Sequence, residues 1–185
     1  DVGWGTDFVG RGEVADHVGD LVDRDRIVTL TGPGGIGKTR LAHEVAGRLG
    51  NTAGSPQTVV VELAPAVPGD ELQLAFARHV GQPSIDAFVV GLDGSRALVI
   101  VDNCEHVVTE AAALVERFAG HTQIMVLATS RIPLGIDGES IVPVTPLDTS
   151  RGETSEALEL FFQRAERAGV SWLDQPEQRA AALEI

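Results

Sequence analysis

Gly32-Pro-Gly-Gly-Ile-Gly-Lys-Thr39 is the most informative string in this chain of 185 residues. It fits the pattern G-x-x-x-x-G-K-[ST], in which glycines let successive backbone N–H groups curl around a phosphate. The apolar, β-branched run 26–31 before it is typical of a strand, and residues 38–49 after it repeat apolar positions at helical spacing. The sequence therefore predicts a phosphate-binding loop between a strand and a helix.

Two side chains of this string have separate predicted roles. Lys38, the only lysine in the sequence, would bring a positive charge to the β- and γ-phosphates, and the Thr39 hydroxyl is a hard oxygen ligand for Mg²⁺. The positive end of the following helix would face the same anion. The residues expected to bind the nucleotide are Gly32, Pro33, Gly34, Gly35, Ile36, Gly37, Lys38, Thr39 and Arg40.

The rest of the chain alternates between two kinds of apolar pattern. Further short runs that are typical of strands occupy residues 58–63, 97–102, 123–128 and 140–144. Helical spacing is found over residues 71–80, 85–90, 106–119 and 153–168, and Pro176 suits the first turn of one more helix. Strands that alternate with helices predict an α/β fold with a parallel sheet covered on both faces, a three-layer sandwich.

Asp102 ends the uniformly apolar run 97–101. The carboxyl ends of parallel strands form the edge where such sheets bind ligands, so we expect Asp102 to hold Mg²⁺ directly or through water. A cap on the following helix is the alternative. Asn103 follows where many nucleotide hydrolases have an acid, but an amide cannot accept a proton from water. Glu105 is therefore a candidate catalytic base, with an ordinary first-turn position on a helix as its alternative.

Thr129-Ser-Arg131 directly follows the predicted strand 123–128. A hydroxyl and an arginine at a strand end can sense a γ-phosphate, because a guanidinium group can donate two hydrogen bonds to its oxygens. A plain surface arginine is the alternative. The candidate catalytic residues are thus Lys38, Asp102, Glu105 and Arg131, and the candidate Mg²⁺ ligands are Thr39 and Asp102.

The composition excludes several classes of protein. With 43% hydrophobic and 22% charged residues, the chain is globular rather than disordered. Its 14 basic and 27 acidic residues give a net charge of −13, which repels a nucleic-acid backbone. The longest aliphatic run, 97–101, is far shorter than the roughly 20 residues that span a membrane, and the single Cys104 cannot form an internal disulfide. We therefore expect no direct contact with nucleic acid or membrane, and a cytoplasmic location.

Four strings in order resemble the STAND class of signal-transduction ATPases. They are Phe8-Val-Gly-Arg11, Val28-Thr-Leu-Thr-Gly-Pro-Gly-Gly-Ile-Gly-Lys-Thr-Arg-Leu-Ala42, Val101-Asp-Asn-Cys-Glu-His106 and Leu127-Ala-Thr-Ser-Arg-Ile-Pro-Leu-Gly135. In particular they resemble the NB-ARC-like ATPase module of large bacterial transcriptional regulators, including LuxR-type and AfsR-like proteins. The resemblance runs from about Phe8 to about Ala168, and four motifs in order are far more specific than the loop alone.

The resemblance implies a P-loop sheet with strand order 5-1-4-3-2, in which the strand before Thr129 separates the Asp102 strand from the loop strand. It implies that Phe8, Val9, Gly10 and Arg11 pack on adenine and ribose, within an N-terminal segment of residues 1–25. Residues 1–148 would form the nucleotide-binding domain, and 149–185 the truncated beginning of a helical subdomain. In the family the module is a switch: ADP holds a closed form, and ATP permits oligomerisation.

Two departures from the family pattern bear on this expectation. Gly12 stands where the family usually has Glu, and the Gly-x-Pro motif, winged-helix domain and DNA-binding domain of the family are not in these residues. We expect an ATP/ADP-binding regulatory switch with slow Mg²⁺-dependent hydrolysis, monomeric as a fragment, in a regulator that oligomerises on activation. The alternatives are a nucleotide-binding scaffold without turnover and a P-loop kinase or phosphotransferase.

Overall fold

The computed structural model describes residues 8, 10–51, 54–69, 71–147, 160–162 and 164–165. The chain divides into one compact unit of Glu13–Thr145 and a second unit made of Asp1–Gly12 and Pro146–Ile185. In the second unit, residues 160–162 and 164–165 are helical, and they are the described part of the helix expected over 153–168. The helix expected from Pro176 lies outside the described residues. The first unit contains the sheet.

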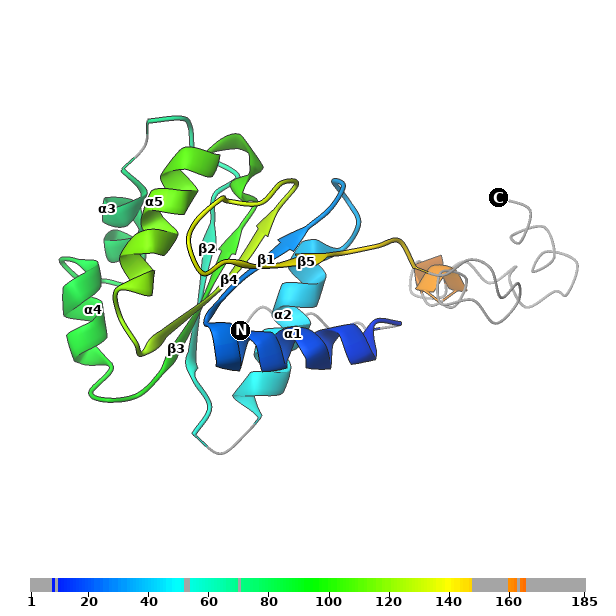
Figure 1. Ribbon diagram of the computed structural model, residues 1–185, viewed down its shortest axis with the longest axis horizontal. Coiled ribbons are helices and arrows are strands. Elements are labelled where there is room, and N and C mark those ends of the chain that lie inside the picture. The colour runs from blue at the N-terminus through cyan, green and yellow to red at the C-terminus, as the bar shows by residue number, and fades with distance from the viewer. Residues whose placement is uncertain are drawn as a thin grey trace, which may run out of the picture. The chain divides into compact units, whose positions relative to one another are not determined.

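The sheet has five parallel strands in the order β2-β3-β4-β1-β5 (Figure 1). The strands are β1 (Ile27–Thr31), β2 (Gln57–Glu62), β3 (Ala97–Asp102), β4 (Ile124–Ser130) and β5 (Ser140–Pro143). The register pairs Leu30 of β1 with Thr129 of β4, and Val99 of β3 with Val126 of β4. The predicted strand order is confirmed, including the position of β4 between β1 and β3.

Helices cover both faces of this sheet (Figure 1). On one face lie α1 (Gly12–Asp25) and α2 (Lys38–Gly50). On the other lie α3 (Leu72–His79), α4 (Ile85–Gly91) and α5 (Val108–Ala119). A single 3₁₀ turn, η1 (Cys104–His106), connects β3 to α5. The predicted α/β three-layer class is confirmed.

Alternating residues of the central strands supply the two cores. Ala97, Val99 and Val101 of β3 are buried in a core shared with α3, α4 and α5, whereas Leu98 and Ile100 are buried on the opposite face. Burial on both faces explains why β3 is an unbroken apolar run rather than an alternating one. On the α3 side, Phe76 makes edge-on ring contacts with both Phe88 and Phe118, with ring centroids 5.3 and 4.8 Å apart.

Two features differ from the sequence expectations, while the bounds of the other elements agree to within two residues. Helix α1 was not predicted, although its buried Ala15, Val18 and Val22 have the i, i+3, i+7 spacing of a helix face. Strand β4 continues two residues beyond its predicted end, because Thr129 and Ser130 still pair with β1. Both side chains are consequently buried, and Arg131 is the first residue outside the strand.

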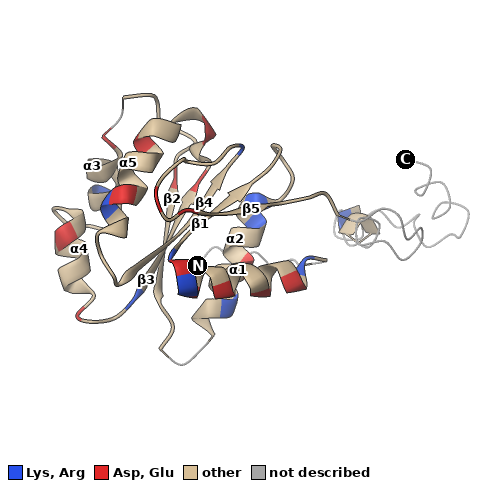
Figure 2. Ribbon diagram, in the orientation of Figure 1, with Lys and Arg blue, Asp and Glu red and all other residues tan. Residues whose placement is uncertain are grey.

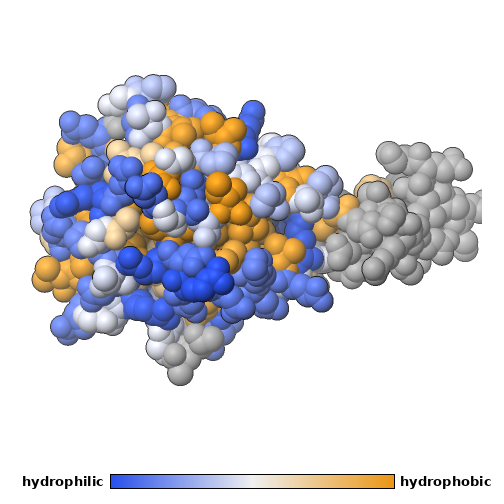
Figure 3. All heavy atoms as spheres, viewed as in Figure 1, coloured by the Kyte–Doolittle hydropathy of each residue, from blue (hydrophilic) through white to orange (hydrophobic). Residues whose placement is uncertain are grey.

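Figure 2 shows acidic residues at several positions along α1. Those that are exposed along one face of this helix are Glu13, Asp16, Asp20 and Asp23. Asp16 pairs with Arg48 and Asp23 pairs with Arg96, so part of the acidic excess is matched inside the unit. Figure 3 shows hydrophilic residues over much of the surface that is visible in this view, with apolar patches between them. Among the described residues, no helix is both long and apolar enough to cross a membrane.

Candidate phosphate-binding site

The loop between β1 and α2 is a tight turn that leads directly into a helix. Gly32 has φ 146°, and a Cβ atom there would lie 2.8 Å from the carbonyl oxygen of Val144, so no larger residue fits without displacement. Gly37, the N-cap of α2, is left-handed with φ 99° and provides no side-chain cap. The first N–H groups of α2 therefore lack the capping side chain that most helices have, as expected of a helix that receives an anion.

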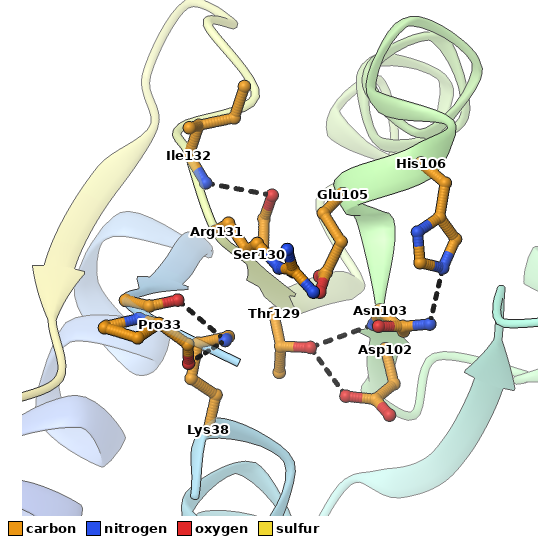
Figure 4. Close-up of polar contacts among 11 residues, drawn as sticks. Pro33, Lys38, Asp102, Asn103, Glu105, His106, Thr129, Ser130, Arg131 and Ile132 are labelled. Atoms are coloured by element: carbon orange, nitrogen blue, oxygen red, sulfur yellow. Dashed lines mark hydrogen bonds and ion pairs between the residues drawn. The ribbon is translucent and has the colours of Figure 1, made fainter. Parts of the chain in front are cut away.

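Lys38 lies folded over this loop (Figure 4). Its Nζ donates hydrogen bonds to the carbonyl oxygens of Gly32, at 2.8 Å, and Pro33, at 3.0 Å. The residue is only 7% exposed. An ammonium group has three N–H donors, so these two carbonyls leave one donor and the full positive charge for an anion in the loop.

Asp102, at the carboxyl end of β3, faces the loop. Its Oδ1 accepts a hydrogen bond from the Thr39 hydroxyl at 2.7 Å and another from the Thr129 hydroxyl at 2.6 Å. This arrangement places the two predicted Mg²⁺ ligands, Thr39 and Asp102, in direct contact. It favours the metal-site interpretation over the helix cap, because the carboxylate bonds to side chains of α2 and β4. The link from Thr129 to Asp102 was not predicted.

Asn103 makes a sharp turn after β3. It is left-handed, with φ 68° and ψ 47°, and its N–H donates to the Thr129 hydroxyl at 2.9 Å. Its side-chain Nδ2 lies 2.8 Å from Nε2 of the exposed His106. The side-chain amide is therefore engaged by an imidazole three residues later, across η1, and the sequence did not predict this contact because it gave no sign of the 3₁₀ turn.

Glu105 and Arg131 form an ion pair beside the loop. Oε1 of Glu105 accepts from Nε of Arg131 at 3.1 Å, with the Glu105 side chain 11% exposed and the Arg131 side chain 62% exposed. The second carboxylate oxygen of Glu105, Oε2, is buried and has no hydrogen-bond partner within the described part of the chain. Arg131 is thus largely exposed and is paired with Glu105. Glu105 itself lies in the 3₁₀ turn η1, before the first turn of α5.

Cys104 lies between these groups and is fully buried. Burial, followed by the charges of Asp102 and Glu105, raises the pKa of its thiol to about 12, so the group stays protonated and unreactive. Cys104 is therefore a small packed residue of the core. Within the described ranges, no three His, Cys, Asp or Glu side chains cluster closely enough to hold a metal ion by themselves.

The structure brings most of the predicted site residues together at the carboxyl edge of the sheet. The glycine loop, Lys38, Thr39 and Asp102 surround one point, and this donor set fits a magnesium–nucleotide complex: an unused ammonium donor, uncapped helix N–H groups and two hard oxygens. Arg40 follows in the first turn of α2. Phe8, Gly10 and Arg11 belong to the second unit, and Val9 lies outside the described residues, so their contact with adenine and ribose remains a prediction.

Two solved structures show what this fold is similar to. Cdc6p from Pyrobaculum aerophilum matches with a TM-score of 0.67 and 14% identity, over 90% of this chain and 52% of that one. The STAND protein PH0952 from Pyrococcus horikoshii, which carries a tetratricopeptide repeat sensor, matches with a TM-score of 0.58 and 21% identity, over 96% of this chain and 28% of that one. The chain has the P-loop ATPase fold.

The sequence relatives are longer proteins, and this chain matches only part of each one. "Putative HTH-type transcriptional regulator Rv0890c" of Mycobacterium tuberculosis is 36% identical over 172 residues, which are 89% of this chain and 19% of the relative. "Uncharacterized protein Rv0894" of the same organism is 32% identical over 171 residues, 88% of this chain and 42% of the relative. No family model matches the chain. These relatives agree with the STAND-class resemblance carried by the four motifs.

Proposed function

We propose that this module is an ATP/ADP-binding switch of a larger transcriptional regulator, and that it hydrolyses ATP slowly with Mg²⁺. The observation that supports this most is the gathering of the Lys38 ammonium, the Thr39 hydroxyl and the Asp102 carboxylate around the glycine loop. Each group has the chemistry that a nucleoside triphosphate needs at that place.

In this proposal, each of these residues has a separate role in binding the nucleotide and its metal ion. Lys38 and the first N–H groups of α2 neutralise the β- and γ-phosphates, and Arg131 donates to the γ-phosphate. Mg²⁺ that binds with the nucleotide would be held by Thr39 and Asp102, and would neutralise charge that develops on the phosphate oxygens. Asn103 adjoins this point with an amide, which orients water without accepting its proton, so turnover is slow.

The regulatory part of the proposal rests on the relatives. This chain spans 19% of the HTH-type regulator and 42% of the second mycobacterial relative, so an output domain belongs to other parts of such proteins. With a net charge of −13, the module itself does not contact DNA directly. We expect the isolated module to be a monomer in the cytoplasm, and the whole regulator to assemble in its ATP form.

Calorimetry with ATP, ADP and GTP, with and without Mg²⁺, tests the proposal. We expect binding of ATP and ADP, tighter for ATP when Mg²⁺ is present, and weaker binding of GTP. A single-turnover assay then separates a switch from a scaffold, because a scaffold would bind ATP and release no phosphate. A phosphorylated product in an acceptor screen would favour a kinase instead, and absence of any nucleotide binding would overturn the proposal.

A further inference from the structure

We propose that Glu105 is a positioning residue, which holds Arg131 by its Nε so that the terminal nitrogens of the guanidinium group face the third phosphate. The inference rests on the proposed function, because it names the residue that makes the same site distinguish ATP from ADP. Its evidence is the geometry of the ion pair relative to the phosphate-binding loop.

The guanidinium group of Arg131 lies against the loop at Gly34. A Cβ atom built on Gly34 would be 3.4 Å from Nη2 of Arg131 and 3.8 Å from its Cζ and Nε. Glu105 contacts the guanidinium at Nε. The contact to Glu105 is thus at Nε, and the terminal nitrogen Nη2 is the guanidinium atom nearest to the Cβ position of Gly34. A γ-phosphate beyond this loop would meet the donors that Glu105 does not use.

Glu105 is well placed to hold the exposed side chain of Arg131. Its neighbour Cys104 is fully buried and Val107 is 1% exposed, so η1 is anchored in the core on both sides of the carboxylate. The hydrogen bond from Asn103 to Thr129 holds the preceding turn against β4, the strand that Arg131 follows. A long arginine side chain loses much rotamer freedom when it is ordered, so a built-in partner reduces the entropy cost of binding phosphate.

A competing role for Glu105 is that of catalytic base, since its Oε2 has no partner among the described groups. A proton taken by this carboxylate would cancel the charge that holds Arg131. The pair would then weaken at the moment when the guanidinium is needed on the γ-phosphate. Positioning is therefore the role that the ion pair favours, and the two roles predict different results for glutamine at this site, which accepts a hydrogen bond but no proton.

The test compares ATP and ADP affinities by calorimetry for Glu105→Ala, Glu105→Gln, Arg131→Ala and the Glu105→Ala/Arg131→Ala double variant. Charged hydrogen bonds of this kind contribute roughly tenfold or more to affinity. We expect Glu105→Ala and Arg131→Ala each to weaken ATP binding about tenfold and ADP binding less than about twofold. The double variant should lose no more ATP affinity than either single variant. Each single change already removes the contribution of the Glu105–Arg131 pair. Glu105→Gln should recover most of the ATP affinity that Glu105→Ala loses.

Two further measurements keep the test independent of folding and of charge. Glu116→Ala, on the exposed face of α5, removes one negative charge away from the site and should match the wild type. The Nε–H signal of Arg131, assigned by its loss in Arg131→Lys, should be protected from exchange without nucleotide in the wild type and not in Glu105→Ala. If Glu105→Ala does not fold, Glu105→Asp shortens the side chain and should lose the same signal.

The outcomes separate the two proposals. A wild-type module that binds no ATP overturns the proposed function and this inference with it. A wild type that binds ATP while Glu105→Ala keeps full ATP affinity overturns the inference alone. Equal loss of ATP and ADP binding in Glu105→Ala would also overturn the inference alone, because the effect would not depend on the third phosphate. If Glu105→Gln keeps full ATP affinity but loses single-turnover hydrolysis, Glu105 would be assigned as the catalytic base.

Discussion

Lys38 is unusual at the residue scale because a buried ammonium group is costly unless it is hydrogen-bonded or paired. Among the described residues it is the one charged residue that is buried, and its Nζ donates hydrogen bonds to two neutral carbonyls. These carbonyls satisfy two donors and leave the charge uncompensated. A positive charge at the N-terminal end of α2 makes this loop a suitable place for an anion.

We expect Lys38→Ala to reduce ATP affinity at least about tenfold, since one charge-assisted contact to phosphate contributes about 1.5 to 3 kcal/mol. The fold should persist, because the variant removes a buried charge without opening the apolar core. Calorimetry measures the affinity and thermal unfolding checks the fold. Arg78→Ala, which removes an exposed positive charge from α3, is the matched control. Equal ATP affinity of Lys38→Ala and wild type would contradict the loop assignment.

Asp102→Asn should weaken ATP binding in the presence of Mg²⁺ more than in its absence. Asparagine keeps an acceptor oxygen for the Thr39 and Thr129 hydroxyls, which now share Oδ1, but it lacks the charge that a divalent cation requires. Paired titrations with Mg²⁺ and with a chelator measure the difference. A loss of the same size under both conditions would show that Asp102 serves the structure of the edge rather than the metal.

At the element scale, the connection from β4 to β5 is held as a defined turn. The Glu139 carboxylate accepts hydrogen bonds from the N–H groups of Leu134 and Gly135, both at 2.9 Å, and Leu134 and Ile136 are buried. This turn begins with Arg131, so its rigidity limits where the guanidinium group can go. The Glu139 carboxylate thus helps to hold the turn that begins at Arg131, eight positions earlier in the chain.

Glu139→Ala should lower the free energy of unfolding by about 1 to 3 kcal/mol, because two N–H groups lose an ionised acceptor. Urea unfolding followed by circular dichroism measures this change, and Glu116→Ala again controls for loss of one negative charge. We also expect a weaker discrimination of ATP from ADP, since the turn would no longer restrain Arg131. Unchanged stability would indicate that water replaces the carboxylate at no cost.

The end of α1 and the start of β5 are joined through Asp25. Its carboxylate accepts from Arg24 and from the Ser140 hydroxyl, and these bonds, Arg24 first, lower its pKa from 3.8 to about 2. A carboxyl whose pKa is lower in the folded state contributes stability above its unfolded pKa, and this contribution is lost as the pH falls. The relevant window therefore runs from about pH 4 down to about pH 2.

Asp25→Asn should reduce stability at neutral pH and flatten the dependence of unfolding free energy on pH within that window. The reason is that asparagine has no proton to take up as the native contacts are lost. Urea midpoints measured at several pH values between 2 and 7 provide the test, with Asp93→Asn, at an exposed position, as control. A slope that matches the wild type would remove Asp25 as a source of acid sensitivity.

On the scale of the whole molecule, the local patterns of the sequence predicted most of the elements and the glycine loop. The order of the strands came from the family resemblance, because apolar runs do not say which runs are neighbours. Contacts between residues at the ends of neighbouring strands could therefore not be predicted from these patterns. They include the hydrogen bond between Thr129 and Asp102 and the ion pair of Glu105 with Arg131. Helix α1 was missed because its charged residues and Gly19 dilute the apolar spacing.

The isolated module should turn over ATP far more slowly than the roughly 10 s⁻¹ of a typical enzyme. The Asn103 side chain contacts His106 rather than an acid, and an amide cannot take the proton of an attacking water. Phosphate release at saturating ATP and Mg²⁺ measures the rate. Turnover of tens per second would contradict a slow switch.

The contact of Gly32 with the backbone of Val144 joins the phosphate-binding loop to the end of the sheet. Val144 also donates to the Thr31 carbonyl at 2.7 Å, so the last strand is tied to the residue just before the loop. Two residues later the chain passes into the second unit. Because Gly32 and Thr31 both contact Val144, we expect a displacement of the loop at Gly32 to move the last residues of the first unit with it.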